Sequence, residues 1–232
     1  GNFFFMLIRQ VDQAESDWYA SQLYAVQDRV LARIDSDSFY LTGGTCLSRC
    51  YYHHRYSDDL HFFFLGEKYD AYEFEHEFVR IVSSLGSEFK MTVTVNEKQY
   101  KRAFVEEGAV NLKIEFVNEP FPVLGDRVRI SSYLIDTKEN IAVNKITAVC
   151  ARKACKDYFD LYFLLQEFSL PELLKLSSNK MVPPSYEELI MSLEKSFWEG
   201  QVLTSLEITE TQFLSFAAEL VEDILAYARQ AG

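Results

Sequence analysis

Side chains that bind metal ions or protons stand close together in SDDLHFFFL, Ser57 to Leu65. Asp58, Asp59 and His61 lead into an apolar run that is typical of a β-strand buried on both faces. Because side chains alternate faces along a strand, Asp59 and His61 share one face, whereas Leu60 faces the core. A buried charge needs a partner or a metal ion. The stretch therefore predicts a polar site at the start of a buried strand.

A third acid, Glu115, lies centrally in another predicted strand, Val110–Val117. If the two strands are neighbours, Glu115 converges with Asp59 and His61 on one divalent cation. Mg²⁺ suits such a cradle, because it prefers oxygen ligands and commonly bridges carboxylates to substrate phosphates. Two structural alternatives remain open: Glu115 pairs with Lys113 on an exposed face, and His61 is a buried histidine with no ligand role.

A glycine pair, Gly43-Gly44, precedes the polar strand and predicts a tight turn into a helix. Glycine lets the backbone approach a ligand closely, and the helix behind it offers N–H groups and the Thr45 hydroxyl to a phosphate. Together with the acidic strand, this pattern favours a nucleoside triphosphate as ligand. Taken alone, the pair is explained equally well as a turn.

Alternating and helical patterns predict an α/β arrangement for the first half of the chain. Helices are expected at 12–34, 45–52 and 69–85, and strands at 39–42, 60–65, 91–95, 100–105 and 110–117. These strands make a mixed sheet of about five strands, flanked by helices.

The second half of the chain is predicted to be helical from Asp136 onward. Capping pairs and apolar stripes place helices at 138–151, 154–168, 185–197 and 211–229. The fold class is therefore α/β (α+β) with a helical C-terminal half. We divide the chain into 1–135 and 136–232, which also suits one continuous domain.

Composition and charge argue against a protein that binds nucleic acid over its whole surface and against a membrane-spanning protein. With 23 basic and 35 acidic residues the net charge is −12, so a polyanion must meet a local basic patch. The longest early apolar run, Phe3–Ile8, is too short to span a bilayer. We expect a cytoplasmic protein with no membrane partner.

Four blocks of this sequence resemble one protein family. They are LTGGTCLSR, HHRYSDDLHFFF, NLKIEF and NKITAVCARKACKDYFDLYFLL, and they lie in the family's order between Phe39 and Phe168. The chain is similar in these blocks to the AbiEii/AbiGii toxins of the nucleotidyltransferase superfamily. The resemblance implies a nucleotidyltransferase-like fold, an NTP as substrate, a toxin role beside a cognate antitoxin, and a tRNA end as acceptor.

The resemblance also implies roles for individual residues. The nucleotide-binding set would comprise Gly43, Gly44, Thr45, Ser57, Lys145, Arg152 and Asp157. Asp59 would be the first metal ligand, and Glu115 the third acid, which helps to activate the acceptor hydroxyl. Lys145 would meet phosphate, and Asp160 together with Asp157 would order the site. The catalytic residues would thus be Asp59, Glu115, Lys145 and Asp160.

An alternative exists for the residues of the last block. Lys153–Asp157 and Lys156–Asp160 have the i,i+4 spacing of ordinary ion pairs on the surface of a helix. In that case Asp157 and Asp160 would be solvated, and would support the helix rather than a site.

His61 departs from the family pattern, which has an acid at this position. The predicted metal ligands are therefore Asp59, His61 and Glu115, and imidazole favours Mn²⁺ over Mg²⁺. Two function hypotheses follow. One is a metal-dependent nucleotidyltransferase; the other is a degenerate domain that binds a nucleotide or a protein partner without catalysis. A third hypothesis, transfer to a small cationic acceptor, is consistent with the overall acidity.

Overall fold

The computed structural model describes residues 6–66 and 70–232, without the side chain of Phe197. Two sequence-based expectations, the apolar run Phe3–Ile8 and the helix start at Tyr69, lie wholly or partly outside the described residues.

The chain forms two compact units. The α/β unit comprises Asp12–Tyr51 and Ser57–Thr137. The helical unit comprises Gly1–Val11, Tyr52–Tyr56 and Lys138–Gly232. The predicted boundary at 135/136 does not separate the two short segments, which belong to the helical unit although they precede that boundary.

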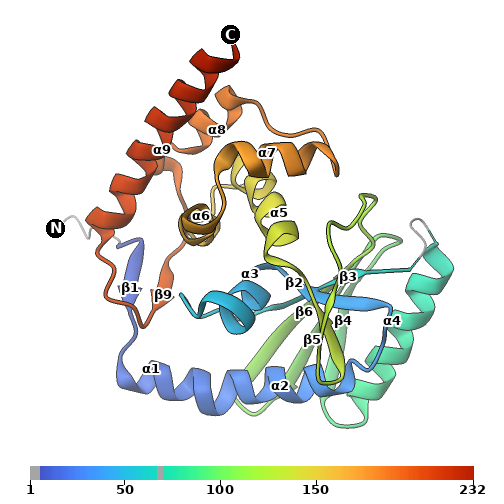
Figure 1. The fold of residues 1–232 in the computed structure, drawn as a ribbon. Helices are drawn as coiled ribbons and strands as arrows, with labels where there is room; N and C mark the ends of the chain where they lie inside the picture. Colours follow the sequence, from blue (N-terminus) through green and yellow to red (C-terminus); the bar gives the residue numbers. More distant parts are fainter. Residues whose placement is uncertain (1–5, 67–69) are drawn as a thin grey trace. The chain divides into compact units, whose positions relative to one another are not determined.

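A mixed sheet forms the centre of the α/β unit (Figure 1). In the part of the chain that the structure describes it has seven strands, in the order β4-β5-β6-β3-β2-β8-β7. The strand bounds are β2 Phe39–Thr42, β3 Leu60–Phe64, β4 Lys90–Asn96, β5 Tyr100–Glu107, β6 Val110–Val117, β7 Val128–Ile130 and β8 Tyr133–Ile135. The predicted mixed α/β class is confirmed. The expected number of about five strands is too low, because β7 and β8 are too short to show alternation.

Aromatic side chains fill one face of this sheet. Phe116 on β6 stacks on Phe62 with ring centroids 5.2 Å apart, and it meets the edges of Phe39 and Phe78. Phe78 lies on α4 (Ala71–Gly86), which covers this face. Because alternate residues point to opposite faces, His61 and Glu115 lie on the other face of the same strands.

The remaining helices of the α/β unit are short and partly π-helical. The predicted helix 12–34 is continuous in sequence but consists of α1 (Gln13–Trp18), the π-helix η1 (Tyr19–Leu23) and α2 (Tyr24–Arg33). Asp12 and Glu15 form a reciprocal capping box at its start. Helix α3 (Gly43–Cys46) continues as the π-helix η2 (Leu47–Tyr52).

The helical unit contains helices α5 to α9 and a two-stranded parallel sheet (Figure 1). The element bounds are β1 Ile8–Gln10, α5 Lys138–Ala151, α6 Cys155–Glu167, α7 Leu170–Ser178, α8 Tyr186–Ser192, the 3₁₀ helix η3 Lys195–Phe197, β9 Val202–Thr204 and α9 Glu210–Ala231. Helix α7 was not predicted, and the helix expected at 185–197 ends early, at Ser192. Strand β1 pairs with β9, which explains why Gly1–Val11 belongs to this unit.

Aromatic side chains also form the core of the helical unit. Tyr158 stacks on Trp198 at 4.0 Å, and Phe159 meets the edge of Phe213 at 5.5 Å. These contacts join α6, the segment after η3, and α9. The predicted caps at Ser185 and Thr209 are confirmed as capping boxes that start α8 and α9.

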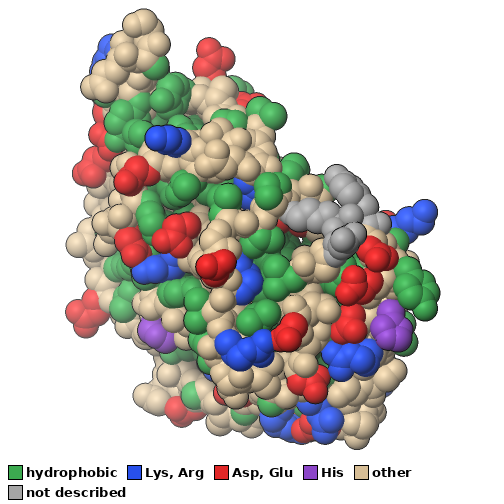
Figure 2. All heavy atoms as spheres, turned by 45° about the vertical axis from the view of Figure 1, so that its right-hand side comes forward, with side chains coloured by type: hydrophobic (Ala, Val, Ile, Leu, Met, Phe, Trp, Pro, Cys, Tyr) green, Lys and Arg blue, Asp and Glu red, His purple; other side chains and the backbone are tan. Residues whose placement is uncertain are grey.

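Surface charge is mixed on the visible side of the molecule. On the face drawn in Figure 2, basic and acidic side chains are interspersed rather than gathered by sign. Charged side chains at the surface of the α/β unit form ion pairs such as Arg29–Glu88 and Arg80–Glu77. Among the residues described, no helix combines the length and apolar character needed to cross a bilayer.

We expect Phe116→Ala to destabilise the α/β unit by about 3–5 kcal/mol, because the change leaves a cavity among three other phenylalanine rings. Unfolding in urea, followed by circular dichroism, measures the free energy. Val93→Ala, at a position 42% exposed on β4, is the matched control and should change stability by less than about 0.5 kcal/mol. Equal stability losses in the two variants would contradict this packing.

Candidate active site

Strands β3 and β6 bring two of the predicted ligands together. The strands are parallel neighbours, and their register pairs His61 with Glu115. Asp59 directly precedes β3, so it lies at the same end of this face. The neighbour relation on which the predicted cradle depends is therefore present in the fold.

A lysine ammonium lies between the two carboxylates of this face. Lys113 Nζ is 3.3 Å from Asp59 Oδ2 and 3.2 Å from Glu115 Oε1. Partial burial lowers the pKa of Lys113, but the two carboxylates outweigh this effect and raise that pKa above its ordinary value. The alternative that pairs Lys113 with Glu115 describes this contact correctly, and the structure adds Asp59 to it.

The donor set bears on whether a metal ion fits. No group of three or more His, Cys, Asp or Glu side chains in residues 6–66 and 70–232 is arranged to hold a metal ion. Asp59 and Glu115 nevertheless both reach the Lys113 ammonium, so this face attracts positive charge. Two carboxylates and an imidazole suit one divalent cation, but they lack the third acid that two dications need.

The glycine turn lies directly beside His61. Gly43 has φ +74°, in the left-handed region that favours glycine, and it starts α3 after Thr42. Thr42 pairs with His61 in the register of β2 and β3. A Cβ atom at Gly43 would lie 3.6 Å from His61 Nδ1. The predicted phosphate-binding turn and the predicted metal face are therefore adjacent within the α/β unit.

Thr45 and Ser57 fix the loop that carries Asp59. Their hydroxyl oxygens are 2.7 Å apart, and both side chains are buried. The Thr45 hydroxyl donates a hydrogen bond to the backbone carbonyl of Asp59. In this structure Thr45 positions Asp59, and its contact with phosphate stays a prediction. The neighbouring Asp58 accepts a hydrogen bond of 2.7 Å from the Tyr19 hydroxyl.

The helical unit holds a second charged cluster, centred on Asp160 of α6. Its fully buried carboxylate binds Arg55 through two hydrogen bonds of 2.7 and 2.9 Å. His54 Nε2 lies 2.6 Å from the same carboxylate, and Lys145 Nζ lies 2.7 Å from it. Three side chains from two distant segments therefore converge on one acid.

Lys145 connects this acid to Asp157, one turn earlier on α6. Lys145 Nζ is 2.7 Å from Asp157 Oδ1, and Arg152 Nε is 2.6 Å from Asp157 Oδ2. Asp157 is fully buried, whereas the Arg152 side chain is 58% exposed. The alternative of exposed i,i+4 pairs is thus wrong for both acids, because both are buried. Asp157 binds Lys145 and Arg152, and Asp160 binds Lys145 and Arg55.

The cluster shifts the ionisation of its members. Burial raises the pKa of Asp160, but Arg55, Lys145 and His54 outweigh it and hold that pKa well below the ordinary value. The pKa of Asp157 is lowered in the same way by Lys145 and Arg152. Burial lowers the pKa of His54 despite the carboxylate of Asp160.

The predicted site residues therefore fall into two sets. Gly43, Gly44, Thr45, Ser57, Asp59, His61 and Glu115 belong to the α/β unit, and Lys145, Arg152, Asp157 and Asp160 belong to the helical unit. Two features were not predicted: the contact of Lys113 with Asp59, and the binding of His54 and Arg55 to Asp160. An available signal for Lys113 was its position two residues before Glu115, on the same strand face.

Comparison with known proteins gives a family and a fold. The family model described as the nucleotidyl transferase AbiEii toxin of a type IV toxin–antitoxin system matches residues 29–188. An uncharacterised protein of Aquifex aeolicus is 28% identical over 162 residues, which cover 68% of this chain and 73% of that protein.

Two solved structures resemble this chain over most of its length. MenT4, a nucleotidyltransferase toxin of Mycobacterium tuberculosis, has a TM-score of 0.58 at 14% identity, covering 94% of this chain and 93% of its own. JHP933 of Helicobacter pylori has a TM-score of 0.57 at 17% identity, covering 96% and 98%. The similarity of the folds confirms the nucleotidyltransferase-like architecture.

We expect Asp160→Asn to destabilise the protein by about 3–5 kcal/mol at neutral pH, because it removes the carboxylate that pairs with the buried Arg55 and takes one of two carboxylates from Lys145. Urea unfolding measures the loss, and Glu222→Gln on exposed α9 is the control. The Asp160 pKa is depressed on folding, so its contribution is present above about pH 4 and is lost as pH falls. The stabilities of wild type and variant should therefore converge in acid; a constant difference would contradict this assignment.

Proposed function

Because the chain belongs to the AbiEii nucleotidyltransferase toxin family, we propose that it transfers a nucleoside monophosphate from an NTP to an acceptor hydroxyl. The observation that carries the proposal is the adjacency of Gly43, His61 and Glu115 on one sheet face. The turn that we propose as the phosphate site thus lies beside the acids that we propose for nucleotidyl transfer. The proposed acceptor is RNA, with a tRNA end as the specific candidate.

The proposed reaction is an in-line displacement at the α-phosphorus. The acceptor hydroxyl oxygen forms the new bond, pyrophosphate leaves, and the hydroxyl proton passes to a base. Glu115 is the proposed base, because its carboxylate is only partly exposed and lies on the strand face next to His61 and the glycine turn. Gly43 and Gly44 bind the triphosphate through backbone N–H groups. Most of the catalysis is positioning and charge stabilisation.

A divalent metal ion, held by Asp59, Glu115 and His61, would neutralise triphosphate charge when bound. The proposed ion is Mg²⁺, or Mn²⁺ in view of the imidazole of His61. Lys113 supplies a fixed positive charge on the same face, so this chain carries part of the required charge in its own side chain. On the helical unit, Lys145 and Arg152 remain proposed phosphate contacts, with Asp157 and Asp160 holding Lys145 in place.

A second candidate function rests on His61 and Lys113. His61 stands where the family pattern has an acid, and the ammonium of Lys113 offsets the negative charge of Asp59 and Glu115. A site with less negative charge suits a domain that binds an NTP or a protein partner without turnover. A cognate antitoxin is a proposed partner under either function. The two functions predict different results for His61→Asp: the substitution should raise transfer with Mg²⁺ in an enzyme with a shifted metal preference, and it should have little effect in a degenerate domain.

We expect label from one α-labelled NTP to appear in total cellular RNA in the presence of Mg²⁺ or Mn²⁺. Asp59→Asn should reduce the transfer by about a hundredfold or more. Asp126→Asn, at an exposed acid of the same unit, should leave it unchanged. His61→Asp should raise transfer with Mg²⁺ if the enzyme is only shifted in metal preference. No transfer by either wild type or His61→Asp, despite NTP binding, would overturn the transferase proposal in favour of the binding domain.

We further expect Lys113→Met to tighten Mn²⁺ binding roughly tenfold, because the ammonium competes for the same two carboxylates. Electron paramagnetic resonance measures free Mn²⁺ directly, without any need for activity. Lys90→Met, which removes an exposed lysine of β4, is the control and should have no effect. Unchanged binding in Lys113→Met, or binding that survives Asp59→Asn, would refute the proposed metal ligands.

A further inference from the structure

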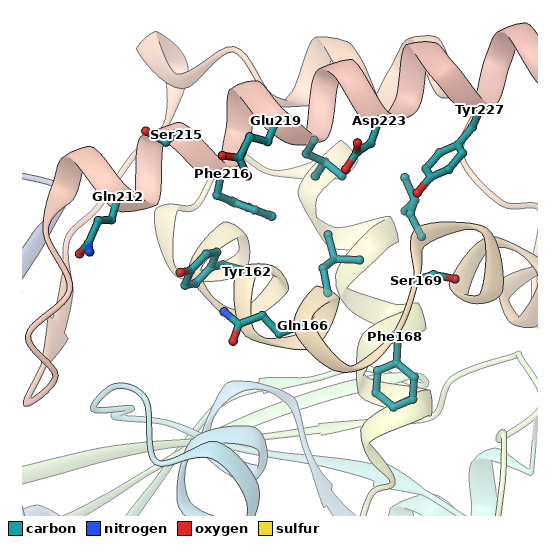
Figure 3. Close-up of a pocket in the computed structure, with 13 residues that line it drawn as sticks. Tyr162, Gln166, Phe168, Ser169, Gln212, Ser215, Phe216, Glu219, Asp223 and Tyr227 are labelled. Atoms are coloured by element: carbon teal, nitrogen blue, oxygen red, sulfur yellow. The ribbon is translucent and has the colours of Figure 1, made fainter.

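A groove of about 720 Å³ lies on the helical unit, lined by α6, the start of α7 and one stripe of α9 (Figure 3). None of the residues that we place in the proposed transferase site lines it. The groove therefore needs an explanation of its own, independent of the nucleotidyl transfer proposed above.

The groove is elongated along α9. Its lining residues on this helix run from Gln212 through Phe216, Leu220 and Asp223 to Tyr227, at spacings of three and four. These positions form a single stripe over four helical turns, about 22 Å long at 1.5 Å per residue. Such a length fits a secondary-structure element of another chain better than it fits a compact small molecule.

The floor of the groove is apolar and aromatic. Phe216 on α9 and Tyr162 on α6 meet edge to face with centroids 5.1 Å apart, and Leu220 is buried beside them. Figure 3 shows the Phe216 ring directed from α9 toward Tyr162. Phe216, Tyr162 and Tyr227 are only half-buried, so parts of their rings face the groove. An apolar partner surface would cover them.

The charges of the groove have one sign. Glu219 and Asp223 are exposed acids one turn apart on α9, and the lining includes no lysine or arginine. Neither acid makes an ion pair or a hydrogen bond with any described residue. Residues 185–232 carry nine acidic and two basic side chains. This surface repels nucleic acid, and it attracts a basic polypeptide.

We propose that the groove binds a basic amphipathic helix of a partner protein. Apolar side chains of that helix at i, i+3/i+4 and i+7 pack on Phe216, Leu220 and Tyr162. Its lysine or arginine side chains pair with Glu219 and Asp223, and they lie over the exposed tyrosine faces, where cations are favoured. The proposed partner therefore has a helix with a stripe of apolar side chains, such as leucine, flanked by basic residues.

The test uses a fluorescent helical peptide, four turns long, with a leucine stripe and lysines elsewhere. Fluorescence anisotropy at physiological salt gives its dissociation constant for the full chain. We expect the double variant Glu219→Lys/Asp223→Lys to weaken binding about tenfold. The matched control is Glu207→Lys/Glu222→Lys, which makes the same change in charge at exposed acids outside the groove, and it should stay within about twofold.

Hydrogen–deuterium exchange on the wild-type chain gives a second readout that needs no variant. Bound peptide should slow exchange in 162–170 and 212–227. Protection of other segments, or equal weakening by the two double variants, would overturn the proposal, since either result places the attraction outside the groove. Absence of binding would overturn it as well. The same peptide with glutamate in place of lysine should not bind. Displacement of the lysine peptide by spermine at equal concentration would show a site for small cations instead.

Discussion

The carboxylate of Asp160 is the charge on which the helical unit depends. It is fully buried, and its desolvation is offset only while Arg55, His54 and Lys145 are all held against it. Arg55 is 105 residues away in the sequence. Together with the hydrogen bonds between this segment and β9, the acid holds Tyr52–Tyr56 in the helical unit, although both neighbouring stretches of chain belong to the α/β unit.

The charge network that starts at Asp160 becomes more exposed along its length. Lys145 is shared between two buried acids, and the last member, Arg152, has a side chain 58% exposed. The buried members fix one another's positions, so they add rigidity rather than surface charge. Arg152 is the most exposed cation of the network, so its positive charge is the most accessible to an anion from solvent.

The sequence predicted the local parts of this protein well. Capping boxes and alternation located most helices and the longer strands, and the positions of His61 and Glu115 on their strands followed from the strand period. Pairing between strands was not predictable in this way. Whether His61 lies beside Glu115 depends on β3 being next to β6, and whether Asp160 is solvated depends on Arg55. Helix α7 was not predicted, although Ser169 and Glu172 form a capping box at its start and Pro171 lies in its first turn, where proline is tolerated.

The pairing of β1 with β9 affects the order in which the two units can fold during synthesis. The residues that β1 pairs with, Val202 to Thr204, are translated 202 − 8 = 194 residues after it. The strands of the α/β unit, by contrast, all lie between residues 39 and 135. During translation the α/β unit can therefore close first, while β1 stays unpaired until β9 is made, and Tyr52–Tyr56 until α6 and β9 are made. A chain interrupted after the sheet would carry the glycine turn and the acids without the basic cluster of Lys145 and Arg152.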